Sequence, residues 1–126
     1  MTPPAATPQA SYRENAVLSA SPVELVVMLY DGANRFLRLA GAAMREREIE
    51  RAHNTLRRAE LIVLHLDEVL DDERGEPIAG QLHPIYRFCL EHMRRARFDL
   101  DAGKLEEVSE LLGELRESWA TIAHGS

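Results

Sequence analysis

Histidine, cysteine and glutamate are the residues of this chain that could hold a metal ion. The chain has five histidines and one cysteine. A di-metal carboxylate site in a helical bundle uses a Glu-x-x-His pair on each of two helices and a further glutamate on each of the other two. Glu50 and His53 have this spacing, but no other histidine has a glutamate three residues before it. We therefore expect no metal site and no ferritin-like metalloenzyme.

A second chemical possibility is a thiol nucleophile, because Cys89 and His92 are one helical turn apart. Cys89 falls within an apolar repeat, however, and a free cysteine in such a position behaves as a small hydrophobic residue. The sequence also has neither a glycine-rich phosphate loop nor a nucleophile elbow. We expect no catalytic activity and no cofactor.

The charged residues indicate a solvated surface. The chain has 21 acidic and 15 basic residues and a net charge of -6. Four arginines, at positions 87, 94, 95 and 97, form a basic stretch, but residues 101–126 that follow are acidic. The acidic run from Asp67 to Glu73 lacks the spacing and central glycine of a calcium loop. Binding to a nucleic-acid backbone requires clustered lysines and arginines, so the sequence predicts no nucleic-acid partner.

The elements that carry these residues are helices. Apolar residues recur at alternating steps of three and four over about residues 22–45, 48–71, 78–101 and 104–123, and no strand pattern interrupts them. Short connections make neighbouring amphipathic helices antiparallel. The sequence predicts an all-α protein, an antiparallel four-helix bundle with an extended or short-helical N-terminal segment. Residues 12–124 are expected to form one domain, preceded by a disordered, proline-rich tail at residues 1–11.

Two local features bear on the helix boundaries. Ser21-Pro22-Val23-Glu24 is a capping box with proline at the first helical position, which predicts the start of the first helix. Pro84 lies inside the third predicted helix, so either this helix kinks there or residues 78–82 form a separate turn. Gly103 is expected to separate the third helix from the fourth.

The location follows from three further observations. A single cysteine cannot form an internal disulfide, which fits a reducing compartment. No apolar run approaches the 18 or so residues of a membrane span, so membrane insertion is not expected. The N-terminus lacks the basic start and apolar region of a secretory signal. We expect a cytoplasmic protein.

Some helices carry more apolar residues than one stripe requires. Tyr86, Leu90 and Met93 form a second stripe on the third helix, and Ile62 and Val69 flank the stripe of the second. Either a wide core absorbs these residues, or they line a hydrophobic groove that accepts an amphipathic helix. We predict the groove. The segment from Tyr12 to Leu18, with Val17 between them, is the candidate cover. The residues alone indicate an interaction module.

The stretch from Tyr12 to Leu37 resembles the opening of the FliS family of flagellar secretion chaperones, the export chaperones of flagellin. The most specific part reads Ala20-Ser21-Pro22, then Leu25, then Met28-Leu29-Tyr30-Asp31-Gly32-Ala33. Further similar stretches are Ile49 to Ala52, Asp72 to Gly75 and Leu111 to Trp119. The resemblance covers about residues 12–120.

This resemblance implies a non-catalytic bundle that binds the C-terminal segment of flagellin in the bacterial cytosol. It implies that the chaperone prevents premature polymerisation and assists delivery to the flagellar type III export apparatus. The export gate and an anti-sigma factor are possible further partners. The alternative is a helical adaptor or regulatory protein of a motility or secretion system that does not bind flagellin.

The resemblance also suggests site residues. Tyr12 and Asn15 match the N-terminal segment of the family, and Tyr86 matches a tyrosine that recurs in its third helix. The sequence departs from the family at Arg87 and Phe88, where aspartate and tyrosine are usual. The predicted flagellin-binding groove consists of Ile62, Val69, Tyr86, Leu90 and Met93. The predicted N-terminal gating segment consists of Tyr12, Asn15, Val17 and Leu18.

Overall fold

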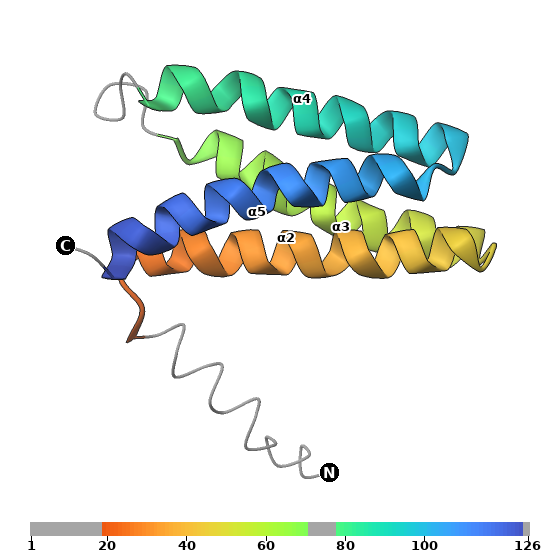
Figure 1. Cartoon of the computed structure of the whole chain (residues 1–126), viewed down its shortest axis with the longest axis horizontal. Helices are drawn as coiled ribbons and strands as arrows, with labels where there is room; N and C mark the ends of the chain where they lie inside the picture. The colour runs from red at the N-terminus through yellow and green to blue at the C-terminus, as the bar shows by residue number, and fades with distance from the viewer. Residues whose placement is uncertain (1–18, 71–77, 125–126) are drawn as a thin grey trace, which may run out of the picture.

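A computed structural model describes residues 19–70 and 78–124, and in these residues the chain forms four helices. The helices are α2 (Pro22–Arg45), α3 (Ile49–Glu68), α4 (Ile78–Asp99) and α5 (Ala102–His124). Each helix runs antiparallel to the one before it (Figure 1). The predicted all-α four-helix bundle is confirmed. The predicted N-terminal segment lies outside the described residues.

The helices are arranged in a ring. α2 packs against α3 and α5, and α4 packs against the same two helices from the other side. α2 and α4 are therefore diagonal to each other, with α3 and α5 between them (Figure 1). Because of this arrangement, the core is built from one apolar face of each helix.

The ends of α2 are fixed by backbone hydrogen bonds. The Ser21 hydroxyl accepts a bond from the Glu24 amide at 3.2 Å, and the Glu24 carboxylate accepts one from the Ser21 amide at 3.2 Å. This confirms the predicted capping box. At the other end, Arg47 has a φ of 60°. Its amide donates a hydrogen bond to the Met44 carbonyl, and the Glu48 amide donates one to the Ala43 carbonyl. These bonds form a Schellman motif, which satisfies the last carbonyls of the helix.

The turn between α4 and α5 differs from the prediction. Gly103 does not separate these helices, because it lies in the first turn of α5. Leu100, with a φ of 53°, makes the left-handed turn instead, and its side chain packs against the core. The Asp101 carboxylate then accepts a hydrogen bond from the Gly103 amide at 3.0 Å. An aspartate that caps α5 thus starts this helix two residues before the predicted position.

The other helix boundaries differ less. α3 ends at Glu68, three residues before the predicted end, and Val69 forms the turn that follows. Pro84 lies inside α4, which is one helix from Ile78 to Asp99, so residues 78–82 are not a separate turn. Proline lacks an amide hydrogen, so one intrahelical bond is missing on an exposed part of this helix.

The core contains one seam from each helix. The apolar seams of α3 and α5 are buried in their middle sections. Near the helix ends, Ile49 of α3, Ile78 of α4 and Ile122 of α5 are exposed. Tyr30 falls outside the main apolar stripe of its helix in the sequence, but the structure buries it completely. The largest fully buried side chains are Tyr30, Tyr86, Leu37, Leu56, Leu66, Met93, Leu105, Leu112, Val63, Val108 and Cys89.

Gly113 gives a test of the helical assignment of α5. A Cβ atom added at Gly113 would meet nothing within 4 Å, so alanine fits without strain. Alanine favours a helix over glycine by about 1 kcal/mol. We expect Gly113→Ala to raise the free energy of unfolding by about 0.5–1 kcal/mol in chemical denaturation.

Gly32 provides the matched control. Its added Cβ would lie 3.3 Å from Cδ1 of Ile62, so this side chain must shift to admit a methyl group. Gly32→Ala should therefore stabilise the protein less than Gly113→Ala. Equal stabilisation by the two variants would contradict the close packing of α2 on α3.

Candidate functional site

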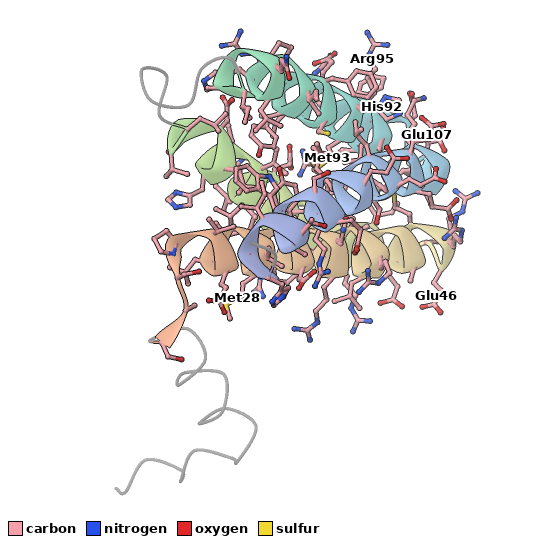
Figure 2. The ribbon with its side chains drawn as sticks, turned by 60° about the vertical axis from the view of Figure 1, so that its left-hand side comes forward. Met28, Glu46, His92, Met93, Arg95 and Glu107 are labelled. Atoms are coloured by element: carbon pink, nitrogen blue, oxygen red, sulfur yellow. The ribbon has the colours of Figure 1, made fainter. Side chains whose placement is uncertain are left out.

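The structure places two residues of the predicted groove in the core. Tyr86 is 1% exposed and Met93 is 0% exposed. Met93 points from α4 into the bundle (Figure 2). Neither residue can contact a partner on the surface of this structure, so both belong to the wide core that was the alternative to a groove.

The other three predicted groove residues are not fully buried, and Leu90 lies on a different helix from Ile62 and Val69. Ile62 is half-buried and faces Gly32 on α2. Val69 follows the end of α3 and is 54% exposed. Leu90 is half-buried on α4, one heptad after His83 and one before Arg97. The five residues therefore do not share one open groove, and their role in binding flagellin stays a prediction. Tyr12, Asn15, Val17 and Leu18 of the predicted gating segment lie outside the described residues.

The rotation of α4 explains this outcome. The apolar repeat of residues 78–101 that contains Cys89 also includes Ile85 and has His92 in step with it, but these two side chains are only half-buried. Cys89 of the same seam is fully buried, and so are Tyr86 and Met93 of the second stripe, so the core face of α4 lies between the two stripes. Two apolar stripes that lie side by side on a helix have the same periodicity. Periodicity alone therefore does not determine which part of them faces the core of the bundle.

Three aromatic residues from three helices meet in the core. The hydroxyl oxygens of Tyr30 on α2 and Tyr86 on α4 are 2.5 Å apart, and their ring centroids are 6.4 Å apart. The indole nitrogen of Trp119 on α5 donates to the Tyr30 hydroxyl at 3.3 Å. Burial raises the pKa of both tyrosines. Sequence reasoning missed this cluster, although polar aromatic residues in an apolar stripe need partners when they are buried.

The tyrosine pair can be tested by removing one hydroxyl. Tyr86→Phe leaves Tyr30 with Trp119 as its only remaining partner in the cluster, and we expect it to lower the free energy of unfolding by roughly 1–2 kcal/mol. Because the pKa of Tyr86 is higher in the folded protein, its contribution is complete below the unfolded pKa of about 10 and is lost as the pH rises further.

Denaturant titrations at neutral and alkaline pH would measure both effects. Tyr86→Phe should lose less stability than the wild type above about pH 10. A double-mutant cycle with Tyr30→Phe should give a coupling energy of about 0.5–1 kcal/mol, and an uncoupled pair would show that the hydroxyls do not interact.

Polar contacts attach α4 to both of its neighbours. Nδ1 of His83 lies 2.5 Å from a carboxylate oxygen of Asp67 on α3. Arg97 donates two hydrogen bonds to Glu60 on α3, one of them at 3.0 Å, and Glu60 is buried. Each carboxylate oxygen of Glu60 thus accepts a hydrogen bond from Arg97. These two bonds compensate for the cost of removing the Glu60 charge from water.

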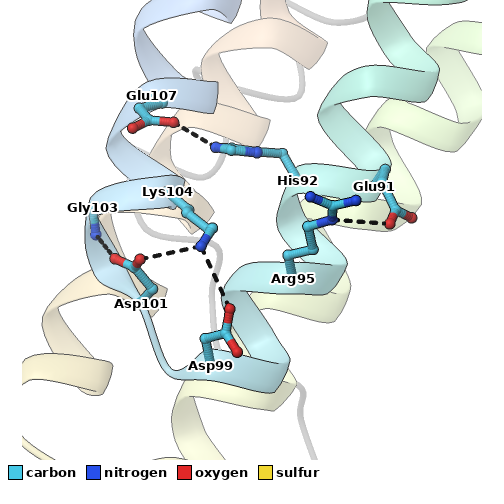
Figure 3. A network of polar contacts seen from close by, with 8 residues as sticks. All are labelled: Glu91, His92, Arg95, Asp99, Asp101, Gly103, Lys104 and Glu107. Carbon is cyan, nitrogen blue, oxygen red and sulfur yellow. Dashed lines mark hydrogen bonds and ion pairs between the residues drawn. The ribbon is translucent and has the colours of Figure 1, made fainter.

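The contacts of α4 with α5 lie at the end where these two helices are joined. Nε2 of His92 lies 2.5 Å from a carboxylate oxygen of Glu107 on α5 (Figure 3). Lys104 bridges Asp99 and Asp101 at 3.4 Å each. These contacts fix the position of α4 relative to α5.

The candidate nucleophile lies in an apolar environment. Cys89 is fully buried, and burial raises the pKa of its thiol to about 12. His92 contacts Glu107 and stacks on Phe88. A thiol with such a pKa holds almost no thiolate at neutral pH, so the geometry does not support nucleophilic catalysis.

Thiol modification provides a direct test of this burial. We expect Cys89 in the native protein to react with an aromatic disulfide reagent at least about a hundredfold more slowly than in the denatured protein. The denatured chain is the control for intrinsic reactivity. Rapid modification under native conditions would show that α4 separates readily from the rest of the bundle and exposes Cys89.

The candidate metal ligands are not brought together. Nε2 of His53 is buried without a hydrogen-bond partner, while Glu50 is exposed. Within residues 19–70 and 78–124, no group of three or more histidine, cysteine or carboxylate side chains is placed to hold a metal ion. None of the helices in these ranges is both long and apolar enough to cross a lipid bilayer.

Comparison with known proteins identifies the family. Residues 5–126 match the family model described as flagellar protein FliS. Relatives named flagellar secretion chaperone FliS occur in Bacillus subtilis, with 30% identity over 89% of this chain and 83% of the relative, and in Salmonella typhimurium, with 35% identity over 87% and 82%. The flagellar secretion chaperone FliSB of Pseudomonas aeruginosa is 33% identical over 88% of each chain. The chain therefore belongs to the FliS family of flagellar proteins.

Proposed function

We propose that this protein is a cytoplasmic export chaperone of flagellin. It binds the C-terminal segment of flagellin, prevents premature polymerisation, and assists delivery to the flagellar type III export apparatus, where the export gate is the expected receiver. The observation that carries this proposal is the family match over residues 5–126, together with relatives of 30–35% identity that are named flagellar secretion chaperones.

The apolar end of the bundle is a suitable place for such a segment. The start of α2 and the end of α5 lie at the same end (Figure 1). Leu25 on α2 and Ile122 on α5 are exposed there. α3 ends and α4 begins at the same end (Figure 1). Val69, which follows α3, and Ile78, the first residue of α4, are exposed as well. We define these four residues as the apolar end surface.

This surface replaces most of the groove that the sequence suggested. Val69 belongs to both sets. Ile62 and Leu90 are half-buried at the sides of the bundle and would add contact area if the segment continues along the helices. Tyr86 and Met93 would take part only if α4 moved, because they are buried.

The N-terminal gating segment is part of the same proposal. Residues 12–18 precede α2, which begins at the apolar end surface. Tyr12, Val17 and Leu18 are apolar residues that can cover exposed side chains, and Asn15 lies between them. We propose that this segment covers the apolar end surface in the free protein and is displaced by flagellin.

The chaperone would prevent polymerisation by burying the apolar stripes of the flagellin C-terminal segment. A segment that is disordered alone loses conformational entropy when it orders on a partner. A large apolar contact is needed to offset this cost, and its burial gives a negative heat-capacity change. While the chaperone covers these stripes, they are not available for contacts between flagellin subunits.

Calorimetric titration with the C-terminal segment of flagellin from the same genome tests this function. We expect tight one-to-one binding with a negative heat-capacity change. Leu25→Asp and Val69→Asp should each weaken binding at least about tenfold, because each buries a carboxylate in an apolar contact. Leu39→Asp is the matched control and should leave binding unchanged, since Leu39 is similarly exposed but lies near the other end of α2.

The outcomes separate the function from the site. Tight binding that the Leu25 and Val69 variants leave unchanged would retain the chaperone function and reject the apolar end surface. No binding to any flagellin of that genome would reject the function and favour a helical adaptor that does not bind flagellin.

A further inference from the structure

The outward side of α4 carries exposed aromatic and arginine side chains. Phe98 is 85% exposed and Phe88 is 54% exposed. Arg95 points away from the bundle (Figure 2). We define the α4 outer face as the exposed residues Arg87, Phe88, Glu91, Arg94, Arg95 and Phe98. Single exposed apolar residues are ordinary, but two phenylalanines among three arginines on one helix face form a patch.

The α4 outer face is positively charged on an acidic protein. Its three arginines and one glutamate leave two positive charges, whereas the whole chain has a net charge of -6. Glu91 accepts hydrogen bonds from Arg94 at 2.8 and 3.0 Å and from Arg95 at 3.2 Å. These bonds lower the pKa of Glu91 to about 2, so the carboxylate is ionised and holds two guanidinium groups in place.

Of the two phenylalanines, Phe88 is already held in place in the free protein. The Phe88 ring stacks on the His92 imidazole, with a centroid distance of 5.2 Å and an interplanar angle of 18°. His92 is in turn fixed by Glu107 of α5 (Figure 3). A side chain that is already ordered loses little entropy on binding. Aromatic residues and arginine are also the types that are most enriched at the energetic centres of interfaces.

We propose that the α4 outer face is a docking surface for a second protein, distinct from the flagellin segment, that presents an acidic helix with apolar residues. Phe88 and Phe98 are ten residues apart, or about 15 Å along the helix, which gives two apolar anchors with arginines between them. Acidic residues of the partner would pair with Arg94 and Arg95, whose positions are set by Glu91.

An anionic membrane is the less suitable partner. Segments that bind anionic lipids carry clusters of roughly four to eight lysines and arginines. The α4 outer face has three arginines and one glutamate, and the acidic remainder of the protein would be repelled by a negatively charged bilayer. These charges favour a localised acidic protein surface.

Site-specific photocrosslinking tests the proposal. Benzoylphenylalanine replaces Phe98 in the full chain, which is expressed in the flagellated bacterium that encodes it, and mass spectrometry identifies both the crosslinked protein and the crosslinked peptide. The same label at Leu39, which is exposed on α2, is the control. We expect a crosslink from position 98, and none from position 39, to a segment with acidic and apolar residues. Arg95→Glu should reduce its yield at least tenfold.

Other results would overturn the proposal. These are no crosslink, equal crosslinking from position 39, crosslinks to lipid alone, or a crosslinked segment without acidic residues. A crosslink to flagellin would also overturn it, because the α4 outer face would then belong to the flagellin-binding site.

A second measurement keeps this test independent of the proposed function. Arg95→Glu and Phe98→Ala replace exposed side chains, so the thermal unfolding midpoint should not change. In calorimetric titration both variants should bind the flagellin C-terminal segment within twofold of the wild type. Weakened flagellin binding would place these residues in the flagellin-binding site and contradict a separate docking surface.

Discussion

The buried, hydrogen-bonded contact between Tyr30 and Tyr86 is the constraint from which the arrangement of the bundle follows. It joins α2 to α4, which are diagonal helices, and Trp119 extends it to α5. Two large phenol rings fill the space between the diagonal helices, and their hydroxyls satisfy each other in an apolar surrounding. The contact therefore sets both the separation of α2 and α4 and the rotation of α4.

The rotation of α4 determines what each of its sides can do. With Tyr86 and Met93 directed inward, Cys89 is also buried and unreactive. The edges of the helix then carry the polar contacts of His83 and His92 with α3 and α5 and the ion pair of Arg97 with α3. The same rotation leaves Phe88 and Phe98 exposed among arginines. One core contact thus decides which residues of α4 are available to a partner.

The two proposed binding surfaces are compatible with one bundle because they use different parts of it. The apolar end surface consists of four exposed apolar residues, one from each helix or the residue that follows it. The α4 outer face is formed by one helix and combines apolar side chains with positive charge. The arginines of the α4 outer face would favour an acidic partner there, which gives one protein a means of distinguishing a second partner from a flagellin segment.

The sequence by itself determined the all-α class, the four helices and the start of α2, because apolar periodicity and a capping box are local signals. The residues from Tyr12 to Leu37 were also sufficient to indicate the family. The sequence did not locate the end of α4, because the left-handed turn falls on Leu100, whose side chain packs in the core, and not on glycine. Only the tertiary structure decided that Tyr30, Tyr86 and Met93 are core residues, so that the predicted groove residues do not form one exposed surface. The physical reason is that periodicity identifies the apolar stripes of a helix, whereas its rotation about its own axis is set by the side chains of the helices packed against it.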